Sequence, residues 1–149
     1  MSETKVIGID LGATNIRAGL VHEGSIHTIQ SKRIKSAGTV EEVLADFYLL
    51  IDTLLDKDVV AIGIGVPSVV DLAKGIVYDV QHIRSWKEVP LKEILEKKYK
   101  LPVYVNNDAN CFALGEFHFG KGRGKSDMIG LSIGTGLGGG AIVNKHLFA

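Results

Sequence analysis

The chain has little cysteine and no excess of either charge, and each of these two features excludes a class of protein. Its 149 residues include one cysteine, Cys111, which excludes an internal disulfide and a zinc site made of several cysteines. Lys and Arg number 17, as do Asp and Glu, so the formal net charge is zero. Attraction of the whole chain to nucleic acid or to a membrane surface is therefore excluded, and we predict neither as a partner.

Long hydrophobic runs are lacking too. No apolar run reaches the length of a membrane span, and Met1 leads into Ser-Glu-Thr-Lys rather than into a signal peptide, which predicts a cytoplasmic protein. A hydrophobic fraction of 46% excludes a disordered chain, and the length is close to the roughly 150 residues of one domain. The residue in excess is glycine, with 18 copies, about 12% of the chain where roughly 7% is usual.

The order of hydrophobic patterns predicts an α/β fold in which a mixed sheet carries helices on both faces. Thr39 and Glu42 fit a capping box at the start of the first helix, and the last helix would turn Phe112, Leu114 and Phe117 toward the core. The predicted segments are strands over residues 6–9, 16–21 and 25–35, a helix over 40–55, a strand over 59–65, a short strand over 76–78, a helix over 90–100, a strand over 102–105 and a helix over 109–119.

Residues 120–126 interrupt this pattern, because three glycines alternate there with basic residues and cannot pack a core. Two strands over 128–133 and 141–143 follow, joined by a turn over 134–140. We therefore predict a lobe over residues 1–119, a hinge loop over 120–126 and the start of a second lobe over 127–149. The hairpin of this second part would leave an unpaired apolar edge, which predicts self-association into a homo-oligomer.

The turn between the first two strands is the first candidate for chemistry. Gly12 allows close approach, so backbone amides and the Thr14 hydroxyl can be aimed at a phosphate. Asp10, at the end of the first strand, is placed to hold a hydrated magnesium ion. The alternative is an ordinary hairpin turn, which is the commoner explanation of such a pattern taken alone.

The glycine-rich segment 134–140 is the second candidate. Gly134, Gly136 and Gly139 formally match a dinucleotide-binding fingerprint, but a strand follows them where that fingerprint needs a helix. Five glycines around Thr135 still suit a backbone that passes close to phosphate oxygens, and we predict phosphate binding over a merely glycine-rich hairpin.

Residues 106–110 are the third candidate, because four of these five positions are Asn or Asp and lie where a strand meets a helix. Ligands bind at such strand ends in α/β sheets. Asp108 could take a proton from a hydroxyl, while Asn107 and Asn110 could hydrogen-bond a polyol. One of these residues would also cap the helix.

Taken together, these motifs resemble the ROK family of sugar kinases and related repressors, in its glucokinase branch. The matching segments are 7–21 (IGIDLGATNIRAGLV), 62–67 (IGIGVP), Trp86, 105–110 (VNNDAN), 113–116 (ALGE) and 133–140 (IGTGLGGG). The resemblance implies the actin-like ATPase fold, two ribonuclease H-like lobes with ATP and sugar in the cleft between them, of which this chain would hold the first lobe and the first hairpin of the second.

The resemblance also implies an activity and its residues. The activity is ATP-dependent phosphorylation of a hexose, glucose to glucose 6-phosphate, with Mg²⁺. Asp108 would be the general base and would hold the sugar together with Asn107. Asp10 would assist Mg²⁺ through water. The ATP phosphates would be bound by Gly12, Thr14, Thr135, Gly136 and Gly138.

Several family features are missing from this sequence. The sugar-binding Glu-x-Gly-His segment, the cysteine-rich zinc motif and the adenine pocket of the family are absent from these residues. Ala13, Ser68 and His82 replace residues more common at their positions. The alternative is therefore a truncated, non-catalytic lobe that binds sugar, phosphate or its own copy. No helix-turn-helix precedes Lys5, which disfavours the repressor branch.

Overall fold

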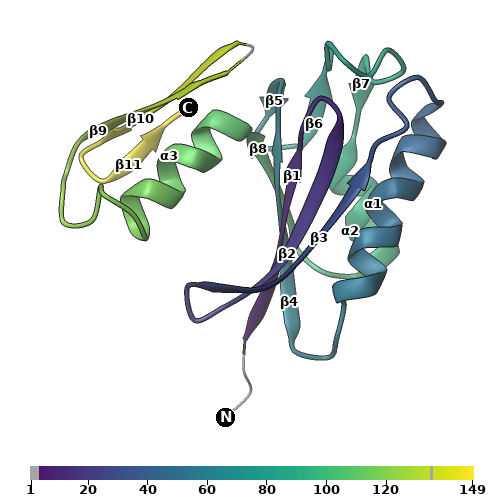
Figure 1. Ribbon diagram of the computed structural model, residues 1–149, viewed down its shortest axis with the longest axis horizontal. Coiled ribbons are helices and arrows are strands. Elements are labelled where there is room, and N and C mark those ends of the chain that lie inside the picture. The colour runs from purple at the N-terminus through teal and green to yellow at the C-terminus, as the bar shows by residue number, and fades with distance from the viewer. Residues whose placement is uncertain (1–3, 135) are drawn as a thin grey trace.

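The computed structural model describes residues 4–134 and 136–149 (Figure 1). Its elements are β1 (Lys5–Leu11), β2 (Asn15–His22), β3 (Ser25–Arg33), α1 (Val40–Leu54), β4 (Val59–Val66), β5 (Val69–Asp71), β6 (Ile76–Tyr78), β7 (Glu88–Val89), α2 (Leu91–Tyr99), β8 (Val103–Asn107), α3 (Asp108–His118), β9 (Met128–Ile133), β10 (Leu137–Val143) and β11 (His146–Phe148). Every predicted strand and helix is present. The short strands β5, β7 and β11 were not predicted. No helix within the described residues is long and apolar enough to cross a membrane.

The large sheet is mixed, as predicted, with the strand order β3-β2-β1-β4-β8. The first three strands form an antiparallel meander, and β4 and β8 run parallel to β1. Helices α1 and α2 cover one face of this sheet, and α3 stands on the other side (Figure 1). The carboxyl ends of β1, β4 and β8 therefore meet at one edge, next to the start of α3.

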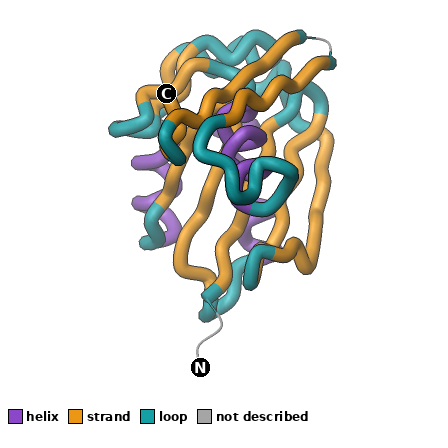
Figure 2. The backbone as a smooth tube through the Cα atoms, turned by 90° about the vertical axis from the view of Figure 1, so that its left-hand side faces the viewer, coloured by secondary structure: helices purple, strands orange, loops and turns teal. Residues whose placement is uncertain are grey.

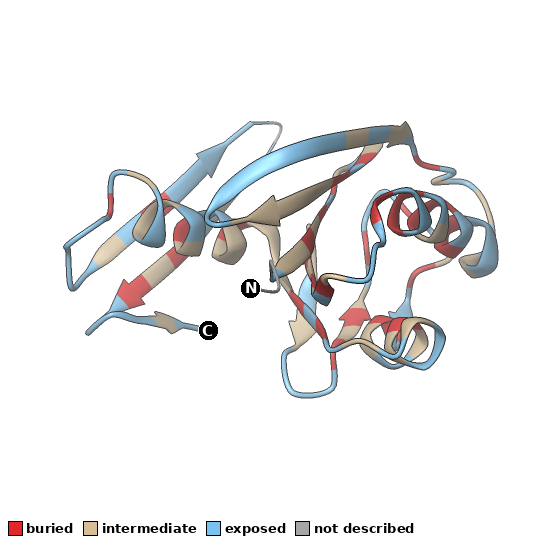
Figure 3. Cartoon of the chain, turned by 90° about the horizontal axis from the view of Figure 1, so that it is seen from below, coloured by how far each residue is buried: buried red, intermediate tan, exposed pale blue. Residues whose placement is uncertain are grey.

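The core lies between the large sheet and its two helices, where the buried residues gather (Figure 3). Strand β1 shows how the sequence decides this, because Ile7, Ile9 and Leu11 alternate with Gly8 and turn inward, whereas Asp10 turns to the opposite face. The predicted capping box at α1 is confirmed by hydrogen bonds from the Thr39 amide to Glu42 Oε2 (2.9 Å) and from the Glu42 amide to Thr39 Oγ1 (3.3 Å).

A second sheet, β11-β10-β9, packs one face against α3, which lies between the two sheets (Figures 1 and 2). The prediction for the buried side of α3 was partly right, since Leu114 and Phe117 are half-buried. Ala109 and Ala113 are its buried residues, and Phe112 is 43% exposed. Small side chains face β10 because this strand approaches α3 closely at Ala109 and Ala113.

The predicted turn over 134–140 is also too long, because β10 already begins at Leu137. Gly138 and Gly140 belong to this strand and lie against α3. A Cβ atom at Gly138 would stand 2.9 Å from the Ala109 Cβ, and one at Gly140 would stand 2.8 Å from the Ala109 carbonyl oxygen. These two glycines are therefore required by the close packing of strand on helix.

Residues 120–126 form a loop that folds back on the end of α3. The amides of Gly120 and Gly122 donate to the Glu116 carbonyl (3.1 and 2.9 Å), and the Lys121 amide donates to Glu116 Oε2 (3.1 Å). The division into two lobes joined by a hinge at this loop stays a prediction.

Candidate functional site

The three sequence motifs meet at one edge of the large sheet. Asp10 of β1 lies beside Gly65 of β4, and Gly65 lies beside Asn106 of β8. A groove of about 1930 Å³ runs along this edge. Of the predicted site residues, those that line it are Asp10, Gly12, Asn107, Asp108, Gly136 and Gly138.

The β1–β2 turn at the edge of this groove is tight, and glycine is required in it. The Gly12 amide donates to the Asn15 carbonyl (2.9 Å), and a Cβ atom at Gly12 would stand 2.9 Å from that same oxygen. This amide is thus used within the turn, contrary to the expectation that it faces a ligand. The amides of Ala13 and Thr14 and the exposed Thr14 hydroxyl make no hydrogen bond to another described residue, so they remain available to a phosphate.

The β9–β10 turn offers open backbone on the other side of the groove. The Gly134 amide donates to the Gly136 carbonyl (2.9 Å), and Cβ atoms at these two glycines would meet nothing within 4 Å. Thr135, a predicted phosphate ligand, lies outside the described residues. The turn therefore leaves space for a ligand at Gly136, whereas Gly138 faces α3.

Three asparagines around the start of α3 fix the backbone at this edge of the site through hydrogen bonds. Asn107 is the N-cap of the helix, since its Oδ1 accepts from the amides of Ala109 (2.9 Å) and Asn110 (3.3 Å). Its Nδ2 donates to the Ser68 carbonyl (3.2 Å), which fixes the loop after β4. The Asn110 Nδ2 donates to Asn106 Oδ1 (3.0 Å). The predicted capping function thus belongs to Asn107, and Asp108 is left for another role.

Asp108 is the first residue of α3 and is half-buried. Its Oδ1 accepts from the Ala109 amide (2.8 Å), and its Oδ2 makes no hydrogen bond to another described residue. The helix N-terminus favours a carboxylate there. Gly65 lies beside the start of α3, where a Cβ atom would stand 3.4 Å from the Asp108 Cα in ordinary van der Waals contact.

The charged groups around the groove act on one another. Partial burial at the groove raises the pKa of the Asp10 carboxyl, the nearby Arg17 guanidinium lowers this pKa, and the Asp108 carboxylate raises it. Burial, with further effects from Asp108 and Asp10, raises the pKa of the Cys111 thiol to about 11. The thiol therefore stays protonated at neutral pH and is a poor nucleophile.

The donor set at Asp10 fits a hydrated magnesium ion. Within the part of the chain that the structure describes, no group of three or more His, Cys, Asp or Glu side chains could hold a metal ion by itself. Mg²⁺ does not need such a cage, since it keeps several waters and binds one or two carboxylates together with substrate phosphates. The exposed Asp10 carboxylate at the groove edge supplies one such ligand.

Sequence reasoning missed Arg17, which also lines the groove. It lies on β2 directly opposite Asp10, with its Nη1 atom 3.9 Å from Asp10 Oδ2. The predicted hairpin could have revealed it, because a turn centred between residues 13 and 14 pairs position 10 with position 17.

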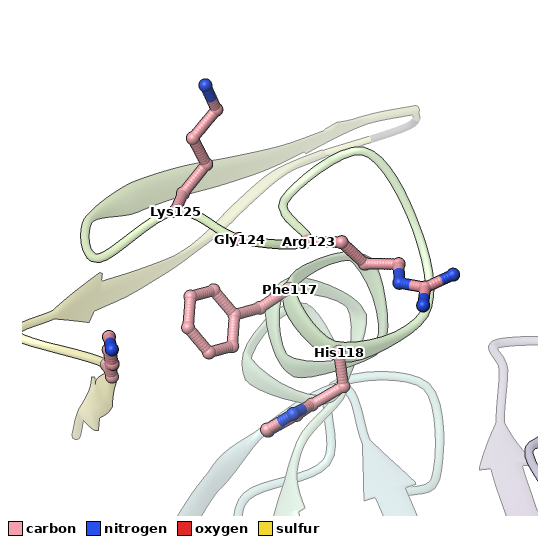
Figure 4. Close-up of a pocket in the computed structure, with 6 residues that line it drawn as sticks. Phe117, His118, Arg123, Gly124 and Lys125 are labelled. Carbon is pink, nitrogen blue, oxygen red and sulfur yellow. The ribbon is translucent and has the colours of Figure 1, made fainter.

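A second, smaller pocket of about 300 Å³ lies at the end of α3, lined by Phe117, His118 and basic residues of the following loop. Figure 4 shows the Arg123 and Lys125 side chains pointing away from each other, so their charges do not converge on one ligand.

Comparison with known proteins identifies the family. A sequence profile described as the ROK family matches residues 6–149. The chain belongs to the ROK family. It is 38% identical to a glucokinase of Streptomyces coelicolor over 143 residues, which are 95% of this chain and 44% of that protein. It is 37% identical to a xylose repressor of Caldicellulosiruptor bescii over 150 residues, covering 96% of this chain and 37% of the repressor.

Solved structures agree with this membership. The crystal structure of a ROK family glucokinase from Streptomyces griseus, in complex with glucose and AMPPNP, matches with a TM-score of 0.86 at 38% identity. The match covers 97% of this ROK chain and 46% of the glucokinase. The predicted actin-like ATPase fold is thus confirmed, and the chain spans less than half the length of these relatives.

Proposed function

We propose that this ROK chain is part of an ATP-dependent hexose kinase that converts glucose to glucose 6-phosphate. The observation that carries the proposal is that Asp108 and Asp10 line one groove together with glycines of both turns, Gly12 and Gly136. The relatives support it, because they include proteins named glucokinase and a structure that contains glucose and AMPPNP.

In the proposed reaction, Asp108 accepts the proton of the attacking sugar hydroxyl at its unoccupied Oδ2. The sugar oxygen forms a bond to the γ-phosphorus of ATP while the bond from that phosphorus to the bridging oxygen of ADP breaks. Asn107, fixed by the helix it caps, holds the sugar beside Asp108. A positioned base of this kind contributes roughly 10²–10⁴-fold to the rate.

The other site residues position the phosphates, which is most of what phosphoryl transfer requires of a protein. In this proposal Gly12 and Thr14 bind the phosphates from one turn and Gly136 binds them from the other, while Gly138 supports the second turn by packing on α3. Thr135 remains a predicted phosphate ligand outside the described residues. Asp10 would hold Mg²⁺ through water, and such an ion would neutralise part of the phosphate charge. The match to a xylose repressor favours a second candidate function, that of a sugar-binding repressor. A repressor of this kind would not need a carboxylate beside the phosphate-binding turns.

A coupled kinase assay on the complete reading frame tests this function. We expect phosphorylation of glucose, with mannose, allose and N-acetylmannosamine as competing candidates. The 149-residue chain alone should turn over poorly, because its relatives use about twice this length. Sugar binding by the complete protein without phosphorylation of any hexose would contradict the kinase and support the binding alternative.

We also propose that a second copy of the chain covers the outer face of the β9–β11 sheet. Strand register places six apolar side chains on this face, each between 45% and 81% exposed: Ile129, Leu131, Ile133, Leu137, Val143 and Phe148. An exposed apolar face of this kind is typical of a protein–protein interaction surface. The predicted self-association is thus proposed through this face as well as the strand edge.

Sedimentation of the 149-residue chain checks this second proposal. The chain should form dimers or larger species, and the double change Leu131→Lys with Ile133→Lys should make it monomeric, because charges cannot be buried in an apolar interface. Leu49→Lys, at a 55% exposed position of α1, is the control and should leave the association unchanged. A monomeric wild-type chain at high concentration would contradict the proposal.

A further inference from the structure

Arg17 brings a guanidinium group to the groove next to the β1–β2 turn. It shares a face of β2 with Gly19 and lies opposite Asp10 in the β1–β2 pair, three residues after Thr14 of the turn. Within the described residues, the Arg and Lys side chains that line the groove are Arg17 and Lys92. The Lys92 Nζ atom lies 6.0 Å from the centre of the Tyr104 ring, on the β8 side of the sheet.

The contact between Arg17 and Asp10 leaves the guanidinium available. At 3.9 Å the two groups are too far apart for a hydrogen bond, and their side chains are 61% and 58% exposed. Exposed pairs of this kind are weak. The Arg17 side chain makes no hydrogen bond to another described residue and is 61% exposed, so its N–H donors are available to a ligand.

The groove needs such a cation if phosphate is to enter it. Asp10 and Asp108 both present carboxylates there and would repel the phosphates. A magnesium ion held by Asp10 would neutralise part of this charge and would leave Arg17 without its carboxylate neighbour. The guanidinium fork matches phosphate oxygens in a bidentate geometry, which a single ammonium group cannot reproduce.

We propose that Arg17 binds the terminal phosphate of the phosphoryl donor through its guanidinium, and so stabilises the charge on the group that is transferred. The inference rests on the proposed kinase function and adds to it a residue from the same hairpin as the phosphate turn. It assigns Arg17 a direct contact with phosphate, distinct from positioning Asp10.

Titration of inorganic tripolyphosphate into the 149-residue chain tests this contact, with amide chemical shifts or calorimetry as the readout, with and without Mg²⁺. Arg17→Gln should weaken binding at least tenfold, since a hydrogen-bonded ion pair is lost. Arg17→Lys should recover part of the affinity, because it restores the charge without the fork. Arg33→Gln, at an exposed position of β3 outside the groove, should bind like the wild type.

Three results would overturn the inference, and they separate it from the proposed function. If Arg17→Gln binds tripolyphosphate as well as the wild type does, the contact is absent while the phosphate site stands. If Arg17→Gln weakens tripolyphosphate binding only when Mg²⁺ is present, Arg17 acts through Asp10 and does not touch phosphate. If the wild-type chain binds no tripolyphosphate, the phosphate site of the proposed function fails together with the contact. Circular dichroism of each variant confirms that it is folded.

Discussion

Changing Asp108 to asparagine should lower the turnover of the complete ROK protein by roughly 10²–10⁴-fold, while its affinity for the hexose changes far less. Asparagine keeps the shape of the side chain and its hydrogen bond to the Ala109 amide, but it cannot accept the proton of the sugar hydroxyl. Turnover and sugar binding measured on the same variant check the prediction.

The structure removes the main competing explanation of such a result. Because Asn107 caps α3, the loss of a cap cannot account for an effect at Asp108. The remaining structural contribution of Asp108 is its charge at the helix N-terminus, typically worth about 0.3–1 kcal/mol of stability. Asp79→Asn, at an exposed carboxylate outside the groove, is the matched control and should retain activity. Normal turnover in Asp108→Asn would remove Asp108 from the catalytic role.

Changing Gly140 to alanine should lower the free energy of unfolding by about 1–3 kcal/mol, the usual cost of overpacking. The added Cβ atom would stand 2.8 Å from both the Ala109 carbonyl oxygen and the Ala113 Cβ, and 3.0 Å from the Asn110 Cα. None of these atoms can rotate away, so β10 must move off α3. Each kcal/mol lowers the melting temperature of a chain of this size by roughly 2–4 °C, which thermal unfolding measures.

Gly63→Ala is the control for this change. Gly63 also lies inside a strand, but a Cβ atom there would meet nothing within 4 Å. The free energy of unfolding of Gly63→Ala should be unchanged or slightly higher than that of the wild type, because alanine reduces the conformational freedom of the unfolded chain. Equal melting temperatures for the two variants would show that the contact between β10 and α3 is looser than the structure has it.

The order of the elements could be predicted from the sequence because it rests on local signals. The alternation in β1 and the spacing of three and four in α1 each reflect which side of one element is buried. The capping box of Thr39 and Glu42 needs only residues of its own turn. The motifs at residues 10–14 and 106–110 were placed at strand ends for the same reason, and the structure brings them to one groove.

Other features depend on contacts between distant segments, and the sequence alone could not supply them. The strands β5, β7 and β11 have three residues or fewer and form because a neighbouring strand pairs with each, which no local pattern reports. Phe112, Leu114 and Phe117 were predicted to form the buried side of α3, but the fully buried residues are Ala109 and Ala113, which face the closely packed strand β10.

What the sequence determined by itself is therefore the α/β order, the two glycine-rich turns and the carboxylates at the strand ends, since each is encoded within a few neighbouring residues. The tertiary structure decided which of these groups face one another. Gly138 and Gly140 pack on α3, Asn107 caps the helix and leaves Asp108 facing the groove, and Arg17 meets Asp10 across a strand pair. Those outcomes depend on strand register and on the distance between a helix and a sheet, which are set by the packing of the whole chain.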